Sequence, residues 1–260
     1  RSLFAPEMWT VGSASIRRSV SIVLLIVFVG LTALFAAFVD PEFNPASTRG
    51  VAIFLSIFFA IGLISLVYAQ TQIRSARAMT LNAALRIRPL NLLIILLAVL
   101  VSRAIGFLPG FLIGLPASYA LMTAAAETET DQPQARIVSA GLIVVIIIAG
   151  FTWLLAIPID LLIGSLIAQT SDPSSVLGVN LLGALQSIVL TIYVVAIELA
   201  FVALFPWTLT SGHRLFVRNR LIWGITFGFV AFAALATIFN PALSGFDVFQ
   251  NPTLLIIGGV

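Results

Sequence analysis

Residues 102–119 read SRAIGFLPGFLIGLPASY, and they place one arginine, two prolines and three glycines inside one of the most apolar parts of the chain. The surrounding run, residues 91–123, would make a helix about 50 Å long, too long for one crossing of a hydrocarbon core of about 30 Å. Pro109 has no amide hydrogen, and its ring clashes with the carbonyl group of Ile105. The run is therefore predicted to form two pieces, with a turn at Gly106, Pro109 and Gly110.

The composition is that of a protein whose main solvent is lipid. Of its 260 residues, 60% are hydrophobic and only 9% are charged, and the mean hydropathy is +1.16. Such a chain has too little polar surface to cover a soluble globule of this size. All 13 basic residues are arginine, a bias typical of GC-rich codon usage, so we expect a bacterial source.

Six apolar runs are long enough to cross a membrane as helices. They cover residues 20–39, 51–69, 91–123, 137–157, 180–206 and 221–239. No strand-like alternation repeats along the chain, so a transmembrane barrel is not expected. The connections are short, and the sequence predicts one all-α integral membrane domain over residues 1–260, a polytopic bundle with about six membrane segments. Because the chain starts at Arg1 and stops in TLLIIGGV, it is also compatible with a fragment of a longer protein.

The arginines indicate how residues 91–123 are placed, because cytoplasmic loops of membrane proteins are rich in basic residues. If the run enters the membrane and returns to the same side, eleven arginines share that side: Arg1, Arg17, Arg18, Arg74, Arg77, Arg86, Arg88, Arg136, Arg214, Arg218 and Arg220. Only Arg49 then lies outside, and Arg103 lies within the membrane. We therefore expect a broken or re-entrant helical hairpin over residues 91–123. The alternative is a single long, kinked helix, which splits the arginines between the two sides.

The hairpin sets the expected topology. The N-terminus and residues 70–90, 124–136 and 208–220 are predicted to be cytoplasmic, whereas residues 40–50, 158–178 and 240–252 are predicted to lie outside. The segment 158–178 follows from the sequence IPID, in which proline beside an acidic residue is typical of a helix end. The expected location is the bacterial cytoplasmic (inner) membrane, crossed several times.

An arginine within a membrane segment needs a partner, because an isolated charge there costs about 2.5 to 3.5 kcal/mol or more. Counted from the cytoplasmic side, Arg103 would lie about 18 Å deep and Glu198 about 13 Å deep, a gap that an arginine side chain can span. Ser187 and Thr191 share a helix face with Glu198. We expect an intramembrane polar site of Arg103, Glu198, Ser187 and Thr191. It is interpreted as a structural ion pair, as a site for a proton, an ion or an anionic substrate, or as polar residues at a wet edge.

Two arginine clusters border the apolar runs and are predicted to contact lipid headgroups. They are Arg74, Arg77, Arg86 and Arg88, and Arg214, Arg218 and Arg220. Trp207 and Trp223 flank the second cluster, at the level where indole rings settle, and His213 is expected in a polar loop. Gly224 and Gly228 form a GxxxG pattern, which we expect to pack inside the subunit rather than at a dimer face. Short clusters between apolar runs do not indicate a nucleic-acid partner.

The sequence lacks the residues that intramembrane enzymes require. Zinc proteases need HExxH, rhomboid-like proteases need a serine and a histidine on facing helices, and aspartyl proteases need two intramembrane aspartates. The chain has no cysteine and one histidine, His213. We therefore predict no catalytic residue, no metal and no cofactor, and expect that the protein is not an enzyme.

Two segments, IGFLPG at residues 105–110 and GHRLFVRNRLIWGITFGFVAFAALATIFNP at residues 212–241, resemble uncharacterised actinobacterial membrane proteins named for an FGLLP motif. Gly106, Leu108 and Pro109 match that motif, whereas Ile105 and Phe107 replace its first Phe and first Leu. The resemblance covers about a fifth of the chain. It implies a polytopic membrane protein and indicates no mechanism.

These observations predict a non-enzymatic scaffold or subunit that binds membrane lipids and other membrane proteins, with both hairpin arms buried against the helix of residues 180–206. The alternative is a transporter or channel for small solutes or lipids that uses the polar site around Arg103 and Glu198, because broken helices around a charge are typical of transporters. The two differ in hydration, since only the transporter needs a water-filled cavity that reaches Arg103.

Overall fold

The computed structural model describes residues 14–39, 43–81, 83–87, 89–105, 117–121, 131–169, 177–206 and 211–239. Within these ranges the chain forms seven helices and a two-stranded ribbon. The helices are α1 (Ala14–Ala37), α2 (Thr48–Ala78), α3 (Pro89–Ile105), α4 (Asp131–Ala168), α5 (Leu177–Leu204), α6 (Ser211–Arg218) and α7 (Arg220–Phe239), and the strands are β1 (Ala83–Ile87) and β2 (Ala117–Leu121).

The predicted apolar runs coincide with helices. Five of them fall largely in α1, α2, α4, α5 and α7, and the first part of residues 91–123 falls in α3. Among the described residues, four helices are long and apolar enough to cross a membrane: Thr48–Ala78, Pro133–Ala168, Gly178–Leu204 and Arg220–Thr237. The described apolar parts of α1 and α3, Val23–Ala37 and Asn91–Ala104, are shorter. The chain is thus mainly helical, as predicted, with several helices of membrane-spanning length.

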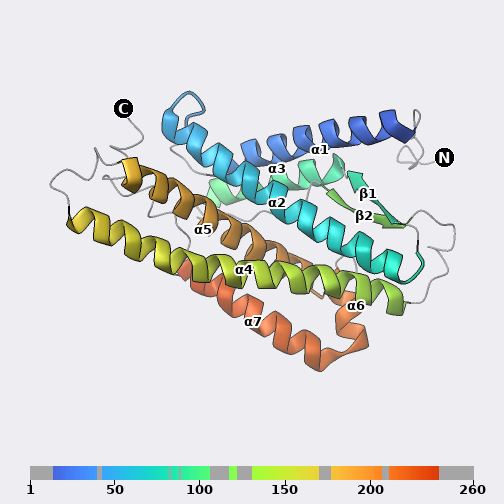
Figure 1. The fold of residues 1–260 in the computed structure, drawn as a ribbon. Helices are drawn as coiled ribbons and strands as arrows, with labels where there is room; N and C mark the ends of the chain where they lie inside the picture. The colour runs from blue at the N-terminus through green and yellow to red at the C-terminus, as the bar shows by residue number, and fades with distance from the viewer. Residues whose placement is uncertain are drawn as a thin grey trace.

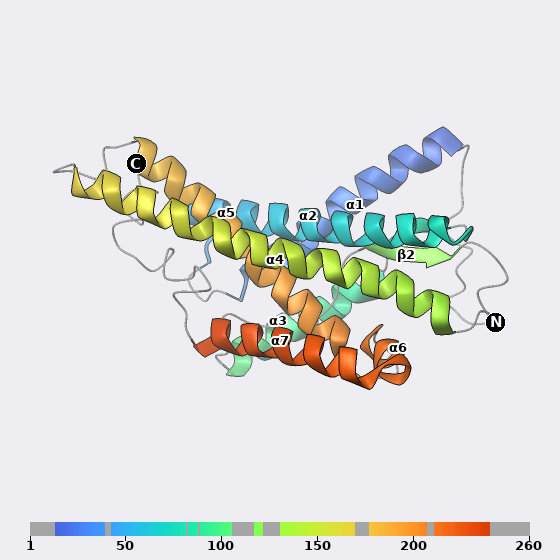
Figure 2. The same cartoon turned by 60° about the horizontal axis from the view of Figure 1, so that its bottom comes forward.

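The connections between the long helices gather at two ends of the molecule (Figure 1; Figure 2). One end, called here the ribbon end, holds β1 and β2, the last turns of α2, the beginning of α4, and α6. The opposite end holds the connection from α1 to α2, the end of α4 and the beginning of α5. Both α3 and α4 therefore begin at the ribbon end.

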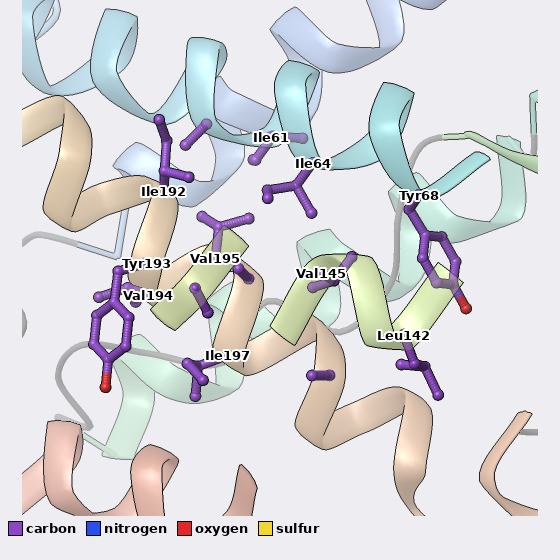
Figure 3. Close-up of a cluster of buried hydrophobic side chains, with 14 of the residues drawn as sticks. Ile61, Ile64, Tyr68, Leu142, Val145, Ile192, Tyr193, Val194, Val195 and Ile197 are labelled. Carbon is purple, nitrogen blue, oxygen red and sulfur yellow. The ribbon is translucent and has the colours of Figure 1, made fainter. Parts of the chain in front are cut away.

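The main core lies where α2, α4 and α5 meet (Figure 3). Ile64 of α2, Val145 of α4 and Val195 of α5 are buried there. Within the apolar segment of α5, 72% of the residues are buried, whereas the share for α7 is 17%. α5 is therefore the central helix, and α7 lies at the periphery, where it packs through one face.

The close approach of α2 and α4 depends on Gly141. A Cβ atom added to this residue would lie 2.8 Å from Cε2 of Tyr68 and 2.9 Å from Cγ of Gln72, well inside the optimal carbon–carbon separation of about 3.5 to 4.0 Å. Tyr68 and Gln72 are both buried, so neither side chain has room to move aside. Only glycine fits at this crossing.

The two-stranded ribbon was not predicted. β1 and β2 pair in antiparallel register, with Ala83 opposite Leu121 and Ile87 opposite Ala117. We expected the second part of residues 91–123 to be helical, but residues 117–121 form a strand. A segment outside a helix must satisfy its backbone groups elsewhere, and pairing with β1 does so here.

Helix α4 extends beyond the end that its sequence suggests. Pro158 lies inside α4, which continues to Ala168, so the predicted connection over residues 158–178 is wrong for its first part. Proline removes the backbone hydrogen bond to the residue one turn earlier, but membrane helices tolerate it where neighbouring groups compensate. Here α5 packs along the same part of α4 through a cluster of buried residues that includes Ile159 and Leu190.

Candidate functional site

Arg103 lies in the last turn of α3 and reaches the end of α1. Its Nη1 donates a hydrogen bond to the main-chain carbonyl oxygen of Phe38, at 3.0 Å. Because α1 ends at Ala37, this carbonyl is one of those at the C-terminal end of the helix that have no hydrogen-bond donor within it. A positive charge at a helix C-terminus is also favourable for the helix dipole. Arg103 therefore caps α1.

This position differs from the one predicted. The side chain of Arg103 is exposed, and it lies at the level where α1 ends, not midway along it. From Pro89 to Arg103 the helix rises by about 21 Å, which carries the arginine most of the way along the neighbouring helix. A charge near the end of a membrane helix has access to water or headgroups and does not need a buried partner.

The structure does not bring Arg103 to Glu198. Glu198 is half-buried on α5, and α5 packs mainly on α4, α2 and α7, whereas α3 packs mainly on α1. The hydrogen bond of Arg103 goes to α1 accordingly. The expectation that the first hairpin arm is buried against α5 is therefore wrong, because the buried residues of α3, Ile95 and Val99, cluster with Val39 at the end of α1.

Two of the predicted polar residues do lie together on α5. Thr191 Oγ1 donates a hydrogen bond of 2.7 Å to the main-chain carbonyl oxygen of Ser187, one turn earlier. Ser187 is buried, and its Oγ has no hydrogen-bond partner in the described part of the chain. Such back-bonding satisfies a hydroxyl group within its own helix, so the pair by itself does not form a binding site.

Other polar contacts link α5 to its neighbours and were not predicted. The hydroxyl groups of Tyr193 and Thr237 lie 3.1 Å apart and join α5 to α7. Gln186 Nε2 donates to Asp160 Oδ1 at 3.2 Å and joins α5 to α4. These residues stand singly in apolar runs, and only knowledge of which helix faces meet could have paired them.

Within the described ranges, two buried polar side chains on α2 lack the kind of hydrogen bond that the pairs on α5 make. Ser65 and Gln72 are almost fully buried, at 0% and 1% exposure, and they share a helix face at positions i and i+7. Ser65 Oγ and Gln72 Oε1 make no hydrogen bond to any described residue. Unpaired polar atoms in an apolar core are costly, so they are the most notable polar groups of the bundle interior.

The predicted hairpin turn, Gly106, Pro109 and Gly110, lies outside the described residues. Its two flanks are described, however. The chain leaves β1 at Ile87 to enter α3 and returns into β2 at Ala117, directly opposite Ile87. The start and the end of this excursion therefore lie side by side at the ribbon end (Figure 1).

The predicted headgroup-contacting arginines belong to elements of the ribbon end, apart from Arg88, which lies outside the described residues. Arg74 and Arg77 are exposed near the end of α2, and Arg218 and Arg220 are exposed where α6 meets α7. Arg86 belongs to β1 and Arg214 to α6. The positive charges of these residues thus gather at one end of the bundle.

An aromatic cluster, called here the aromatic corner, lies where α5, α6 and α7 meet. Its members are Phe201, Phe205, Phe216, Trp223 and Phe227. The rings of Trp223 and Phe227 stack at 5.1 Å, and Phe216 meets Trp223 edge-on at 4.9 Å. Trp223 Nε1 also donates a hydrogen bond of 2.8 Å to the carbonyl oxygen of Leu204, the last residue of α5. These contacts fix the beginning of α7 to the end of α5.

Helix α6 begins directly against that same end of α5. A Cβ atom on Gly212 would overlap the main chain of Leu204, so a side chain does not fit there. His213 lies in α6 and is half-buried, which corrects its predicted place in a loop; Trp207 lies outside the described residues. α6 carries apolar and basic residues on different faces, and its apolar face supplies the packing that the loop prediction omitted.

The GxxxG pair does not pack inside the subunit as expected. No described heavy atom lies within 4 Å of a Cβ atom built on Gly224 or Gly228. The inward residues of α7 are instead Val230 and Ala234, which lie about 80° to 160° away around the helix. The sequence showed the pattern but did not show which face of α7 meets the bundle.

The fold defines a class of protein but not a family. The four long apolar helices and their many exposed large hydrophobic residues, such as Leu161 and Phe232, indicate a helical membrane protein. In the described ranges, no three potential metal ligands lie together. No protein-family model matches the chain, and comparisons with curated proteins and with solved structures find no match. The resemblance to the FGLLP-motif proteins therefore stays a prediction.

Proposed function

We propose that this chain is a non-enzymatic integral protein of the bacterial inner membrane that acts as a scaffold or subunit and binds lipids and other membrane proteins. The observation that carries the proposal is the close packing of its centre. Where α2 crosses α4, the space beside Gly141 does not admit even a methyl group. Helix α5, which packs against α2, α4 and α7, is the most buried of the four long helices. Such a centre suits a fixed framework.

In this proposal residues 91–123 form a hairpin that enters and leaves the membrane at the ribbon end, and that end faces the cytoplasm together with the N-terminus. The register of the ribbon, with Ile87 opposite Ala117, supports the return of the chain. The exposed arginines at the same end support the orientation, because basic residues are retained on the cytoplasmic side.

A transporter or channel is the second candidate, and one observation favours it. Ser65, Gln72 and Ser187 bury polar atoms that have no hydrogen-bond partner among the described residues. In a transporter, polar groups inside the bundle, with Arg103 and Glu198, would face water or a solute. In a scaffold, the same groups would stay dry or hold isolated water molecules.

Cysteine accessibility distinguishes the two candidates, and the absence of native cysteine makes single substitutions clean. Ser65→Cys and Ser187→Cys would be treated in liposomes with a small, positively charged methanethiosulfonate reagent. Ala78→Cys, exposed at the end of α2, is the positive control. A scaffold gives reaction at residue 78 alone. Reaction at residue 65 or 187 at a similar rate replaces the scaffold with the transporter.

A further inference from the structure

Two exposed arginines flank the turn from α6 to α7. Arg218 ends α6 and Arg220 begins α7, and both are exposed. Asn219 between them caps α7, because its Oδ1 accepts hydrogen bonds from the main-chain amides of Leu221 and Ile222, at 3.1 and 3.0 Å. A cap of this kind fixes the first turn of a helix, so the turn places two guanidinium groups at a defined site.

Arg220 is also held by the aromatic corner. Its Cζ lies 5.3 Å from the ring centre of Phe216, within the range of a cation–π interaction. Phe216 meets Trp223, and Trp223 donates to the carbonyl oxygen of Leu204. Arg220 is therefore connected through two rings to the main chain of α5.

A long apolar surface lies along α7 and begins at Leu221, the residue after Arg220. It consists of Leu221, Ile225, Phe229 and Phe232, each more than 60% exposed. The spacing of these residues, three or four apart, puts them on one face of the helix. A ligand that matches the whole surface must carry negative charge at one end and be apolar along the rest of its length.

We propose that this surface binds an anionic glycerophospholipid, with its phosphate against Arg218 and Arg220 and its acyl chains along the apolar face of α7. Planar guanidinium groups suit phosphate oxygens, which they can bind in pairs. A zwitterionic lipid carries its own positive charge and matches the two arginines less well. The inference rests on the proposed membrane location and names the lipid class for which this corner is selective.

The test is a competition between two lipids for binding to the full chain. The complexes of protein and lipid are released from detergent micelles, and their masses are measured by native mass spectrometry. The chain is mixed with equal amounts of phosphatidylglycerol and phosphatidylcholine. We expect the unmodified chain to retain phosphatidylglycerol preferentially. In the double variant Arg218→Gln with Arg220→Gln, the preference should fall at least about tenfold, since each basic residue near a lipid surface contributes roughly a factor of five. Arg218→Lys with Arg220→Lys keeps the charge but loses the paired guanidinium contacts, so its preference should lie between those of the unmodified chain and the glutamine variant.

The matched control is Arg74→Gln with Arg77→Gln, which removes the same charge from exposed residues at the same end of the bundle. Arg74 and Arg77 are also predicted to contact headgroups, so this control should lower the preference, but by clearly less than the Arg218 and Arg220 variant does. An equal loss in both double variants, or no loss in the Arg218 and Arg220 variant, overturns the proposal. If the double variant does not fold, Arg220→Gln alone should lower the preference about fivefold, and an unchanged preference there also overturns it.

Failure of the broader proposal would be seen separately. Carbonate washing of cell membranes leaves an integral protein in the membrane fraction, and its release would contradict the proposed membrane function. A chain that stays in the membrane fraction but shows no preference for phosphatidylglycerol contradicts the lipid site alone.

Discussion

At Gly141 a helix has no room for a side chain, because the ring of Tyr68 and the stem of Gln72 occupy the space. Gly150 lies on the same helix, and no atom of another described element lies within 4 Å of a Cβ atom built on it. Both glycines reduce the intrinsic stability of a helix by roughly 1 kcal/mol relative to alanine. Only at Gly141 does tertiary packing require this cost.

Alanine substitution should therefore have opposite effects at the two glycines. Gly141→Ala should lower the free energy of unfolding by about 1 to 3 kcal/mol, as overpacking of a close-packed core does. Gly150→Ala, the matched control, should be neutral or raise it by up to about 1 kcal/mol. Circular dichroism during heating in a mild detergent measures both changes. Equal losses of melting temperature would mean that α2 and α4 do not cross at Gly141.

Arg103 shows which part of a polar site can be predicted from the sequence and which part cannot. A charge within an apolar run identifies the residue as one that needs a partner, and the structure gives it one, the main-chain carbonyl oxygen of Phe38. A main-chain acceptor at a helix end has no side-chain signal, so the sequence suggested Glu198 instead. Matching depths along two helices cannot show that the helices are neighbours, and α3 packs mainly on α1.

Among the elements, the helices were predictable and the ribbon was not. A run of about twenty apolar residues sets the length and place of a helix by itself, and the six predicted runs all contain one. The pairing of residues 83–87 with residues 117–121 joins segments far apart in the chain, and both are too short to show a clear alternation. Pro158 was likewise misread, because its tolerance within α4 depends on the packing of α5.

The contact between α5 and α7 includes a hydroxyl pair whose strength can be measured. Tyr193→Phe and Thr237→Val each remove one of two groups that lie 3.1 Å apart in the buried interface. A double-mutant cycle should give a coupling above the average of about 0.6 kcal/mol for such bonds between membrane helices and up to the maximum of about 1.7 kcal/mol, because both hydroxyl groups are buried. Chemical or thermal unfolding in detergent provides the four free energies.

Thr226→Val is the matched control for this cycle, since Thr226 is half-buried on α7 and donates to Ile222 of its own helix. Its combination with Tyr193→Phe should be additive within about 0.5 kcal/mol. A coupling between Tyr193 and Thr237 that is no larger than this would show that the two hydroxyl groups do not meet in the protein.

For the whole molecule, the proposed orientation predicts which positions face the cell exterior. Single cysteines would replace Ser75, Thr128, Ser174 and Ser211 in a chain that has no other cysteine. A membrane-impermeant maleimide should label Ser174→Cys in intact cells and the other three variants only after permeabilisation. Labelling of Thr128→Cys or Ser211→Cys in intact cells would contradict the hairpin, because residues 91–123 would then cross the membrane once.

The two-stranded ribbon makes the residues between Ile87 and Ala117 an insertion that starts and ends at the same place in the fold. Because Ile87 and Ala117 face each other, the residues between them start and finish at the same place, and a two-residue Asn-Gly turn is the typical way to join such strands. A shortened chain of this kind would still begin α4 at the ribbon end and keep every later helix in its present direction. Among the described helices, α1 would lose its main contact with α3, which includes the buried residues Ile95 and Val99. The excursion between the two strands is therefore a unit whose removal would not invert the helices that follow.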